Sequence, residues 1–117
     1  MSVIEANFST AMKNGLLDLW RSGTFRVAAF GVSEPFLLGH SSFSFLYPSG
    51  GVIQMEGPSK NIEIAANSFL ESIKVQKHTG GANWVTHISW EPSTTITWPN
   101  GGNLLVNEIK VFIEDVE

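Results

Sequence analysis

The sequence predicts a mainly β fold, an antiparallel β-sandwich or barrel, with one amphipathic helix near the N-terminus. Short segments alternate apolar and polar side chains along most of the chain, which is the period of a half-buried strand. Gly, Pro and Asn separate these segments at spacings of about eight to twelve residues, as in all-β domains. No alternation of strand and helix is present, so a parallel sheet is not expected.

The length of 117 residues predicts a single domain over residues 1–117. A chain of this size is long enough to bury one core. We expect the helix at about residues 8–21 and the β region at about residues 24–115.

The predicted helix lies in the segment FSTAMKNGLLDLWRSG. Ser9 or Thr10 is a suitable N-cap, and Ser22-Gly23 is a suitable end. At about 100° per residue, one face collects small and apolar residues, namely Phe8, Ala11, Met12, Gly15, Leu16 and Leu19. The other face carries polar residues, namely Thr10, Lys13, Asn14, Asp18 and Arg21, and Trp20 lies at the border. We therefore expect the apolar face to pack on the sheet, with Gly15 allowing a close approach.

The segments that follow have the composition of strands. They are TFRVAAF (24–30), SFSFLY (42–47), GVIQMEG (51–57), NIEIAA (61–66), ESIKVQK (71–77), WVTHISW (84–90), TTITW (94–98), NLLV (103–106) and EIKVFIE (108–114). Residues 68–71 also have the form of a helix capping box. We favour a strand there, because Gly80-Gly81 follows too soon for a long helix and Ile73 and Val75 alternate with polar residues.

Three glycine-rich segments, at residues 49–51, 79–81 and 100–102, are expected to form hairpin turns. Glycine tolerates the positive φ that such turns require. The third turn predicts that TTITW pairs antiparallel with the strand that follows it.

Alternation in the last strand predicts that one set of side chains points inward, namely Ile109, Val111 and Ile113. The charged residues between them are then expected to point outward, namely Glu108, Lys110 and Glu114.

Composition excludes several kinds of partner. The formal net charge is −4 and the basic residues are scattered, whereas nucleic-acid binding needs a concentrated basic surface. The absence of cysteine excludes disulfides and thiolate chemistry. The segment MSVIEANFST lacks the features of a signal peptide, and no apolar run reaches the roughly eighteen residues of a membrane helix. We therefore expect a protein that is made in the cytoplasm, is not secreted by a signal peptide, and binds neither nucleic acid nor membrane.

No catalytic signature is present in the sequence. His40, His78 and His87 lack metal-ligand spacing, and the segment GVSEP lacks the second glycine of a nucleophile elbow. The carboxylates stand alone or cluster near the C-terminus. We expect no catalytic, metal-binding or cofactor-binding residues, no cofactor and no enzymatic activity. The alternative is a small β-barrel enzyme, in which two carboxylates, or a His and a carboxylate, converge in a pocket.

Trp84, Trp90 and Trp98 lie close together in the sequence. Trp84 and Trp90 are an even number of residues apart, so a regular strand would place them on one face. Core packing, a protein–protein surface and sugar stacking are all open roles for these rings. Charged residues make up only 15% of the chain, which indicates either a partly covered surface or a compact β-protein with polar uncharged loops. We predict a contact surface that draws on Trp84, Trp90 or Trp98 together with exposed phenylalanines such as Phe36 and Phe43.

The overall layout resembles that of small virion proteins of tailed bacteriophages. The resemblance lies in the helix AMKNGLLDLW, the strand TFRVAAF, the segment WVTHISW and the closing TTITWPNGGNLLVNEIKVFIE, and it includes no catalytic motif. It implies a structural role, in which the protein binds a capsid lattice and reinforces it as decoration or cement proteins do.

The same resemblance implies that the partners are other virion chains, in the capsid or the tail. The protein would be a homo-oligomer or a set of lattice-bound copies in the virion, after synthesis in the host bacterial cytoplasm. Many copies on a lattice allow individually weak contacts to hold. A tail- or neck-associated virion protein and a carbohydrate-binding β-module are the alternatives.

Overall fold

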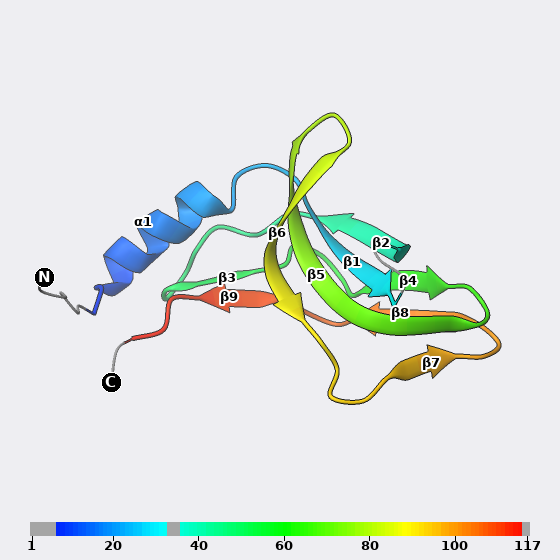
Figure 1. Cartoon of the computed structure of the whole chain (residues 1–117). Helices are drawn as coiled ribbons and strands as arrows, with labels where there is room; N and C mark the ends of the chain where they lie inside the picture. The colour runs from blue at the N-terminus through cyan, green and yellow to red at the C-terminus, as the bar shows by residue number, and fades with distance from the viewer. Residues whose placement is uncertain (1–6, 33–35, 116–117) are drawn as a thin grey trace, which may run out of the picture.

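The computed structural model describes residues 7–32 and 36–115, and within them one helix precedes a series of strands (Figure 1). The elements are α1 (Thr10–Trp20), β1 (Phe25–Gly31), β2 (Leu37–Phe43), β3 (Val52–Gln54), β4 (Lys60–Ile64), β5 (Ser68–Gly80), β6 (Asn83–Trp90), β7 (Ile96–Trp98), β8 (Gly102–Val106) and β9 (Lys110–Phe112). The mainly β fold with one helix near the N-terminus is confirmed. The segment ESIKVQK lies within the long strand β5, as expected, and is not helical.

The main sheet has the strand order β2-β1-β5-β6, and its pairs are antiparallel. β7 lies beside the first residues of β5, on the same side of that strand as β6. Two short ladders, β3 with β9 and β4 with β8, complete the fold. The described strands thus form three separately hydrogen-bonded sheets rather than one closed barrel.

A sharp corner joins the main sheet to the β4–β8 ladder. The pairing keeps one register across it, from Ser68 with Trp98 in the main sheet to Ile64 with Gly102 in the ladder. Gly101 turns with a φ of 77°, which glycine adopts without steric cost. A Cβ on Gly101 would lie 3.0 Å from the carbonyl oxygen of Ile64. The two backbone segments therefore approach each other too closely at this point for a larger residue to fit easily.

This corner explains why the hairpin expected around residues 100–102 is wrong. A turn does form, with the Gly101 N–H donating to the Trp98 carbonyl at 3.3 Å. However, β7 pairs with β5 and β8 pairs with β4, because the chain changes sheets at the turn. The other two glycine turns are hairpins as expected: Ser49 and Val52 exchange both backbone bonds, and residues 81–82 connect β5 to β6.

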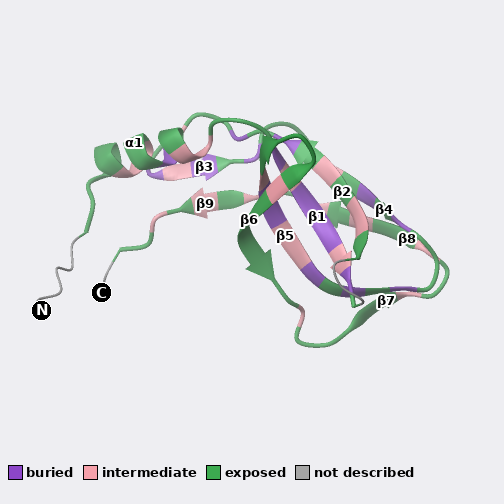
Figure 2. Cartoon of the chain, turned by 45° about the horizontal axis from the view of Figure 1, so that its top comes forward, coloured by how far each residue is buried: buried purple, intermediate pink, exposed green. Residues whose placement is uncertain are grey.

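The core lies between the inner face of the main sheet and the two ladders. Its buried apolar residues are Leu17, Phe25, Val27, Ala29, Phe43, Phe45, Ile53, Met55, Ile62, Ile64, Leu70 and Val75. Burial is concentrated along β1 and β5, whereas α1, β6 and β9 are largely exposed (Figure 2). The core is therefore covered unevenly, and much of the chain lies outside it.

The last strand has the expected register. The side chains of Ile109, Val111 and Ile113 are partly buried against the core. Those of Glu108, Lys110 and Glu114 are exposed.

The molecule is more extended than its length requires. The radius of gyration is 16.5 Å, compared with the roughly 13 Å that compact domains of this size have. Figure 1 shows the reason: α1 and the β3–β9 ladder project from one end of the main sheet. An extended shape leaves a larger share of apolar side chains uncovered.

The helix packs through the face opposite to the expected one, so that expectation is wrong. Leu17 is buried, whereas Leu16 and Leu19 are 43% and 77% exposed. Gly15 makes no close approach, because a Cβ placed there would meet nothing within 4 Å.

Replacing two neighbouring leucines should have opposite consequences for stability. Leu17→Ala should lower the free energy of unfolding by about 2–5 kcal/mol, because it removes a buried side chain. Leu19→Ala should change it by no more than about 0.5 kcal/mol, because its side chain lies in water. Urea unfolding at low protein concentration measures both. Equal losses for the two variants would contradict this orientation of α1.

Candidate protein-interaction surface

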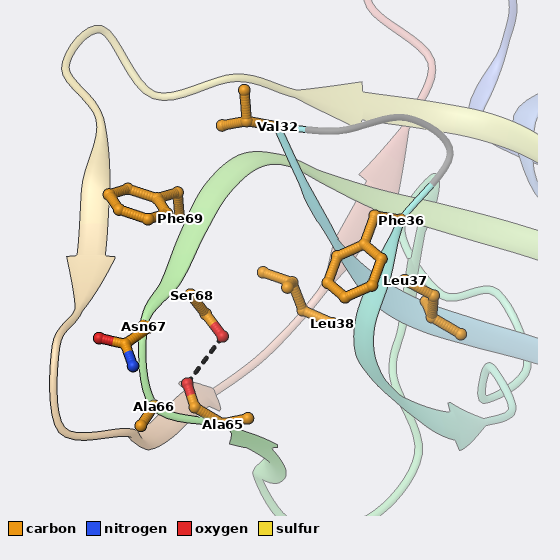
Figure 3. A pocket seen from close by; sticks show the side chains of 9 residues that line it. All are labelled: Val32, Phe36, Leu37, Leu38, Ala65, Ala66, Asn67, Ser68 and Phe69. Atoms are coloured by element: carbon orange, nitrogen blue, oxygen red, sulfur yellow. Dashed lines mark hydrogen bonds between the residues drawn. The ribbon is translucent and has the colours of Figure 1, made fainter.

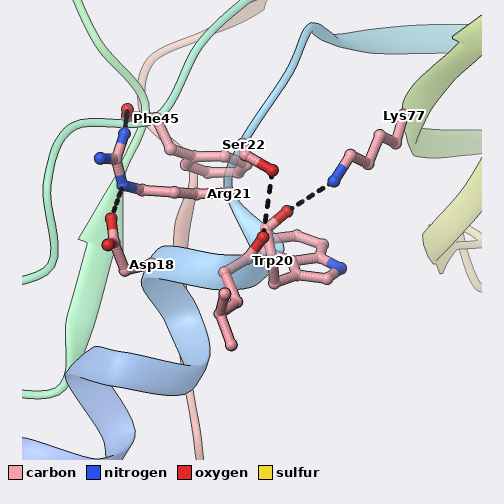
Figure 4. A network of polar contacts seen from close by, with 7 residues as sticks. Asp18, Trp20, Arg21, Ser22, Phe45 and Lys77 are labelled. Carbon is pink, nitrogen blue, oxygen red and sulfur yellow. Dashed lines mark hydrogen bonds and ion pairs between the residues drawn. The ribbon is translucent and has the colours of Figure 1, made fainter.

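Trp20 fixes the C-terminal end of α1 to the core. Its ring centroid lies 5.0 Å from that of Phe25 and 5.5 Å from that of Phe45. Its indole Nε1 donates a 3.0 Å hydrogen bond to Nδ1 of His87. Nζ of Lys77 donates a 3.0 Å bond to its carbonyl oxygen (Figure 4). The lysine thereby satisfies a carbonyl at the helix end and complements the negative end of the helix dipole.

Arg21, the residue after the helix, strengthens this attachment (Figure 4). Its Nε lies 2.7 Å from the Asp18 carboxylate, and its Nη1 donates to the Phe45 carbonyl at 3.3 Å. Its guanidinium lies 3.9 Å from the ring centroid of Tyr47, which is a cation–π distance. The polar side of the helix end therefore faces the protein.

Two polar residues dock the N-terminal half of the helix. Lys13 forms an ion pair with Asp115 at 2.6 Å. Oδ1 of Asn14 accepts a 2.8 Å hydrogen bond from the backbone N–H of Gly51. Both side chains were expected to face solvent, and both are instead partly buried.

This docking leaves the apolar side of α1 facing away from the protein. We call this surface the apolar stripe, and it consists of Ala11, Met12, Gly15, Leu16 and Leu19 on the helix and Phe8 just before it, all exposed. Its four large side chains expose roughly 400 Å² together, a patch size that is often functional on a monomer. No charged residue interrupts the stripe. The helix is thus amphipathic with its apolar side outward.

A second apolar surface lies at the other end of the molecule. A hollow of about 410 Å³ lies between the end of β1, the start of β2 and the β4–β5 connection (Figure 3). We call it the apolar hollow, and the large apolar side chains in its lining are those of Val32, Phe36, Leu37, Leu38 and Phe69. The hydroxyl of Ser68 in its wall already donates a 2.7 Å bond to the Ala65 carbonyl. None of the lining residues that the structure describes is charged, so they suit an apolar guest.

The two phenylalanines of the predicted contact surface have different positions. Phe36 is exposed and lines the apolar hollow. Phe43 is 5% exposed, so its expected exposure is wrong. Its ring packs 6.0 Å from that of Phe25 and 5.0 Å from that of Phe45, because alternation in β2 turns it to the inner face.

Trp84 and Trp90 lie on opposite faces of β6, which corrects the expectation that they share one. Ile88 and Thr86 pair with consecutive residues of β5, so His87 between them is an extra residue. Such a β-bulge reverses the alternation beyond it. Trp90 is 52% exposed.

Trp84 is part of a polar layer on the outer face of the main sheet. The guanidinium of Arg26 lies 4.5 Å from its ring centroid, and the ring of His78 lies 4.9 Å away. Nε of Arg26 donates to Gln76 at 2.8 Å, and Gln76 donates to the Thr86 hydroxyl at 3.0 Å. Partial burial lowers the pKa of Arg26 from its ordinary value. Because Arg26 covers a face of the ring, Trp84 is not an open platform for a sugar.

Trp98 is a structural residue of the corner. Its side chain packs against the core, and its carbonyl accepts a 2.8 Å hydrogen bond from the N–H of Asn67. The structure therefore does not bring Trp84, Trp90 and Trp98 together into one surface.

The histidines have partners or lie apart from one another. His87 accepts the Trp20 bond, and a ring nitrogen of His78 lies 2.8 Å from the Gly81 carbonyl oxygen. In residues 7–32 and 36–115, no three His, Asp or Glu side chains gather in a way that would hold a metal ion. No helix in this part of the chain is long and apolar enough to cross a membrane.

Sequence reasoning found the residues of the apolar stripe but assigned them to the core, and it missed Leu38 and Phe69 of the hollow. The signal for the stripe was the border position of Trp20, whose large ring next to Leu17 defines a second, smaller apolar face. No local pattern marks the hollow, because its walls are far apart in the sequence.

Comparison of the chain with protein-family models, curated proteins and solved structures finds no match. The geometry and the physical chemistry of the surface therefore carry the functional argument.

Two tryptophan substitutions should distinguish the structural ring at the corner from the exposed ring on β6 by their effect on stability. Trp98→Ala should lower the free energy of unfolding by about 3 kcal/mol or more, because it removes an aromatic ring packed on the core. Trp90→Ala should lower it by less than about 1 kcal/mol, because half of its surface is already in water. Urea unfolding monitored by circular dichroism gives both values, and a larger loss for Trp90→Ala would contradict this assignment.

Proposed function

We propose that the protein is a non-enzymatic structural component of a phage particle, which binds other protein chains and reinforces the capsid lattice. The observation that carries this proposal is the apolar stripe. A helix that keeps its polar side against its own chain and its apolar side in water is suited to contact another protein. The resemblance of the sequence layout to small virion proteins gives the particle as the setting.

The composition of the exposed surface supports binding to protein. Interface centres are depleted in charged residues and enriched in aromatic residues and Met. The described residues of the stripe and the hollow have this composition, since they include Phe8, Met12, Phe36 and Phe69 and none of them is charged. The stripe lies on the projecting helix and the hollow lies at the other end of the molecule, and both are open to a neighbouring chain.

The carbohydrate-binding alternative has less support. Sugar stacking needs an open aromatic face with polar groups around it. Trp84 has polar neighbours but is covered by Arg26, and Trp98 packs on the core. Trp90 is exposed, but its neighbour on the same face is Ile88.

Incorporation into particles tests the proposal. A tagged copy supplied during infection by a phage that encodes the chain should co-sediment with purified particles. Leu16→Glu with Leu19→Glu should abolish this co-sedimentation, because two charges would be buried without partners. Thr10→Glu is the matched control on the same helix but outside the stripe, and it should leave co-sedimentation unchanged.

Two results would contradict the proposal. One is a wild-type chain that stays in the soluble fraction while particles form. The other is a monomer that ignores particles and binds a defined oligosaccharide at micromolar concentration, which would favour the carbohydrate-binding module. Labelling of the copies in electron micrographs separates a capsid position from a tail or neck position.

A further inference from the structure

We infer that the partner of the apolar stripe is a second copy of this chain, and that the stripe of one copy inserts into the apolar hollow of the next. This inference rests on the proposed structural function and names its partner. It follows from the presence, on one chain, of a projecting apolar surface, the stripe, and a concave apolar surface, the hollow.

The two surfaces cannot meet within one molecule. α1 projects from one end of the main sheet, while the hollow lies at the other end, where β1 ends and β2 begins (Figures 1 and 3). The described residues extend over 50 Å along the longest axis. Any contact between stripe and hollow therefore joins two molecules.

The surfaces match in size. The stripe exposes roughly 400 Å², and the exposed parts of Val32, Phe36, Leu37 and Phe69 also amount to roughly 400 Å². A standard interface covers about 800 Å² on each partner, with a polar rim around an apolar centre. The stripe and the hollow thus supply an apolar centre of suitable area.

The volumes also agree. The hollow measures about 410 Å³, whereas an engineered cavity left by one leucine side chain is about 150 Å³. The hollow therefore has room for two or three side chains of that size. Leu19 is the most exposed of the large side chains of the stripe and lies between Leu16 and the helix end, so the side chains of Leu16 and Leu19 are suited to fill the hollow.

Among the residues that the structure describes, neither surface carries a charge that would repel the other, because the stripe and the lining of the hollow contain no Asp, Glu, Lys or Arg. Gly15 lies in the middle of the stripe with open space over it, so another backbone or ring can approach the helix closely there. A contact of this kind is driven by apolar burial and should vary little with salt.

A stripe-to-hollow contact is heterologous, which distinguishes it from a symmetric pair of helices. Each copy retains a free stripe or a free hollow after pairing, so assembly continues to a closed ring or an open filament. A symmetric contact between two stripes would stop at a dimer.

Complementation between two defective variants tests the inference. Leu19→Glu disables the stripe and leaves the hollow intact, whereas Phe69→Glu disables the hollow and leaves the stripe intact. In sedimentation velocity, the wild-type protein should form species larger than a dimer as its concentration rises. Each variant alone should need at least about 30-fold higher concentration to associate, as expected for the loss of an anchoring residue. An equimolar mixture should form a heterodimer and nothing larger, because only one productive contact remains.

A disulfide experiment gives the second measurement, and the absence of cysteine from the chain makes it specific. Leu19→Cys mixed with Ala66→Cys should give an oxidised heterodimer, since Ala66 lines the hollow. Leu19→Cys mixed with Ala82→Cys, at the exposed tip of the β5–β6 hairpin, is the matched control and should give none. A mixture of Leu19→Glu and Phe69→Glu that stays monomeric, a Leu19→Cys homodimer, or a wild-type chain that is monomeric at all concentrations would overturn the inference.

The two proposals fail separately. If the pure protein does not self-associate but stripe variants still lose incorporation into particles, the structural function stands and the partner is another chain. If the copies assemble head to tail but do not enter particles, the self-assembly stands and the proposed setting is wrong.

Discussion

The attachment of Trp20 and Leu17 to the core determines the orientation of the whole N-terminal arm. Trp20 is fixed on three sides, by aromatic rings, by the bond to His87 and by Lys77 at its carbonyl. Once it is seated, the period of the helix sets the direction of every other side chain. Residues three and four positions away then face the protein, and those half a turn away face water.

The bulge in β6 is part of the same arrangement. An unbroken β6 would alternate regularly, and the extra residue His87 is the one that meets the Trp20 indole. Bulges commonly redirect a side chain at the edge of a sheet. Here the redirected histidine connects the edge strand to the helix end, so an irregularity in one element stabilises the position of another.

Local patterns in the sequence predicted most of the elements but not their partners. Alternation identified most of the strands and the register of Ile109, Val111 and Ile113, because these three side chains pack against the core. The predicted hairpin was wrong because a corner at Gly101 is indistinguishable in sequence from a hairpin turn. The strands that pair with β7 and β8 are β5 and β4, which lie much earlier in the sequence. The prediction of the buried face of α1 was wrong because the helix has two apolar faces, and the larger of them lies outside the core. Alternation along β2 places the side chain of Phe43 on the inner face, where the structure has it. Only its assignment to an exposed contact surface was wrong.

Amphipathicity by itself does not say which side of a helix faces its own chain. The usual inference assumes that a chain buries its apolar side internally, which is correct when the chain is complete as a folding unit. α1 is held instead by one leucine, one tryptophan ring and several polar contacts, while about four large apolar side chains remain in water. That arrangement has a cost in isolation, because exposed apolar area is unfavourable. The cost is removed when another molecule covers the stripe, and the molecule that we propose is a second copy of the chain, whose described surface includes an apolar hollow.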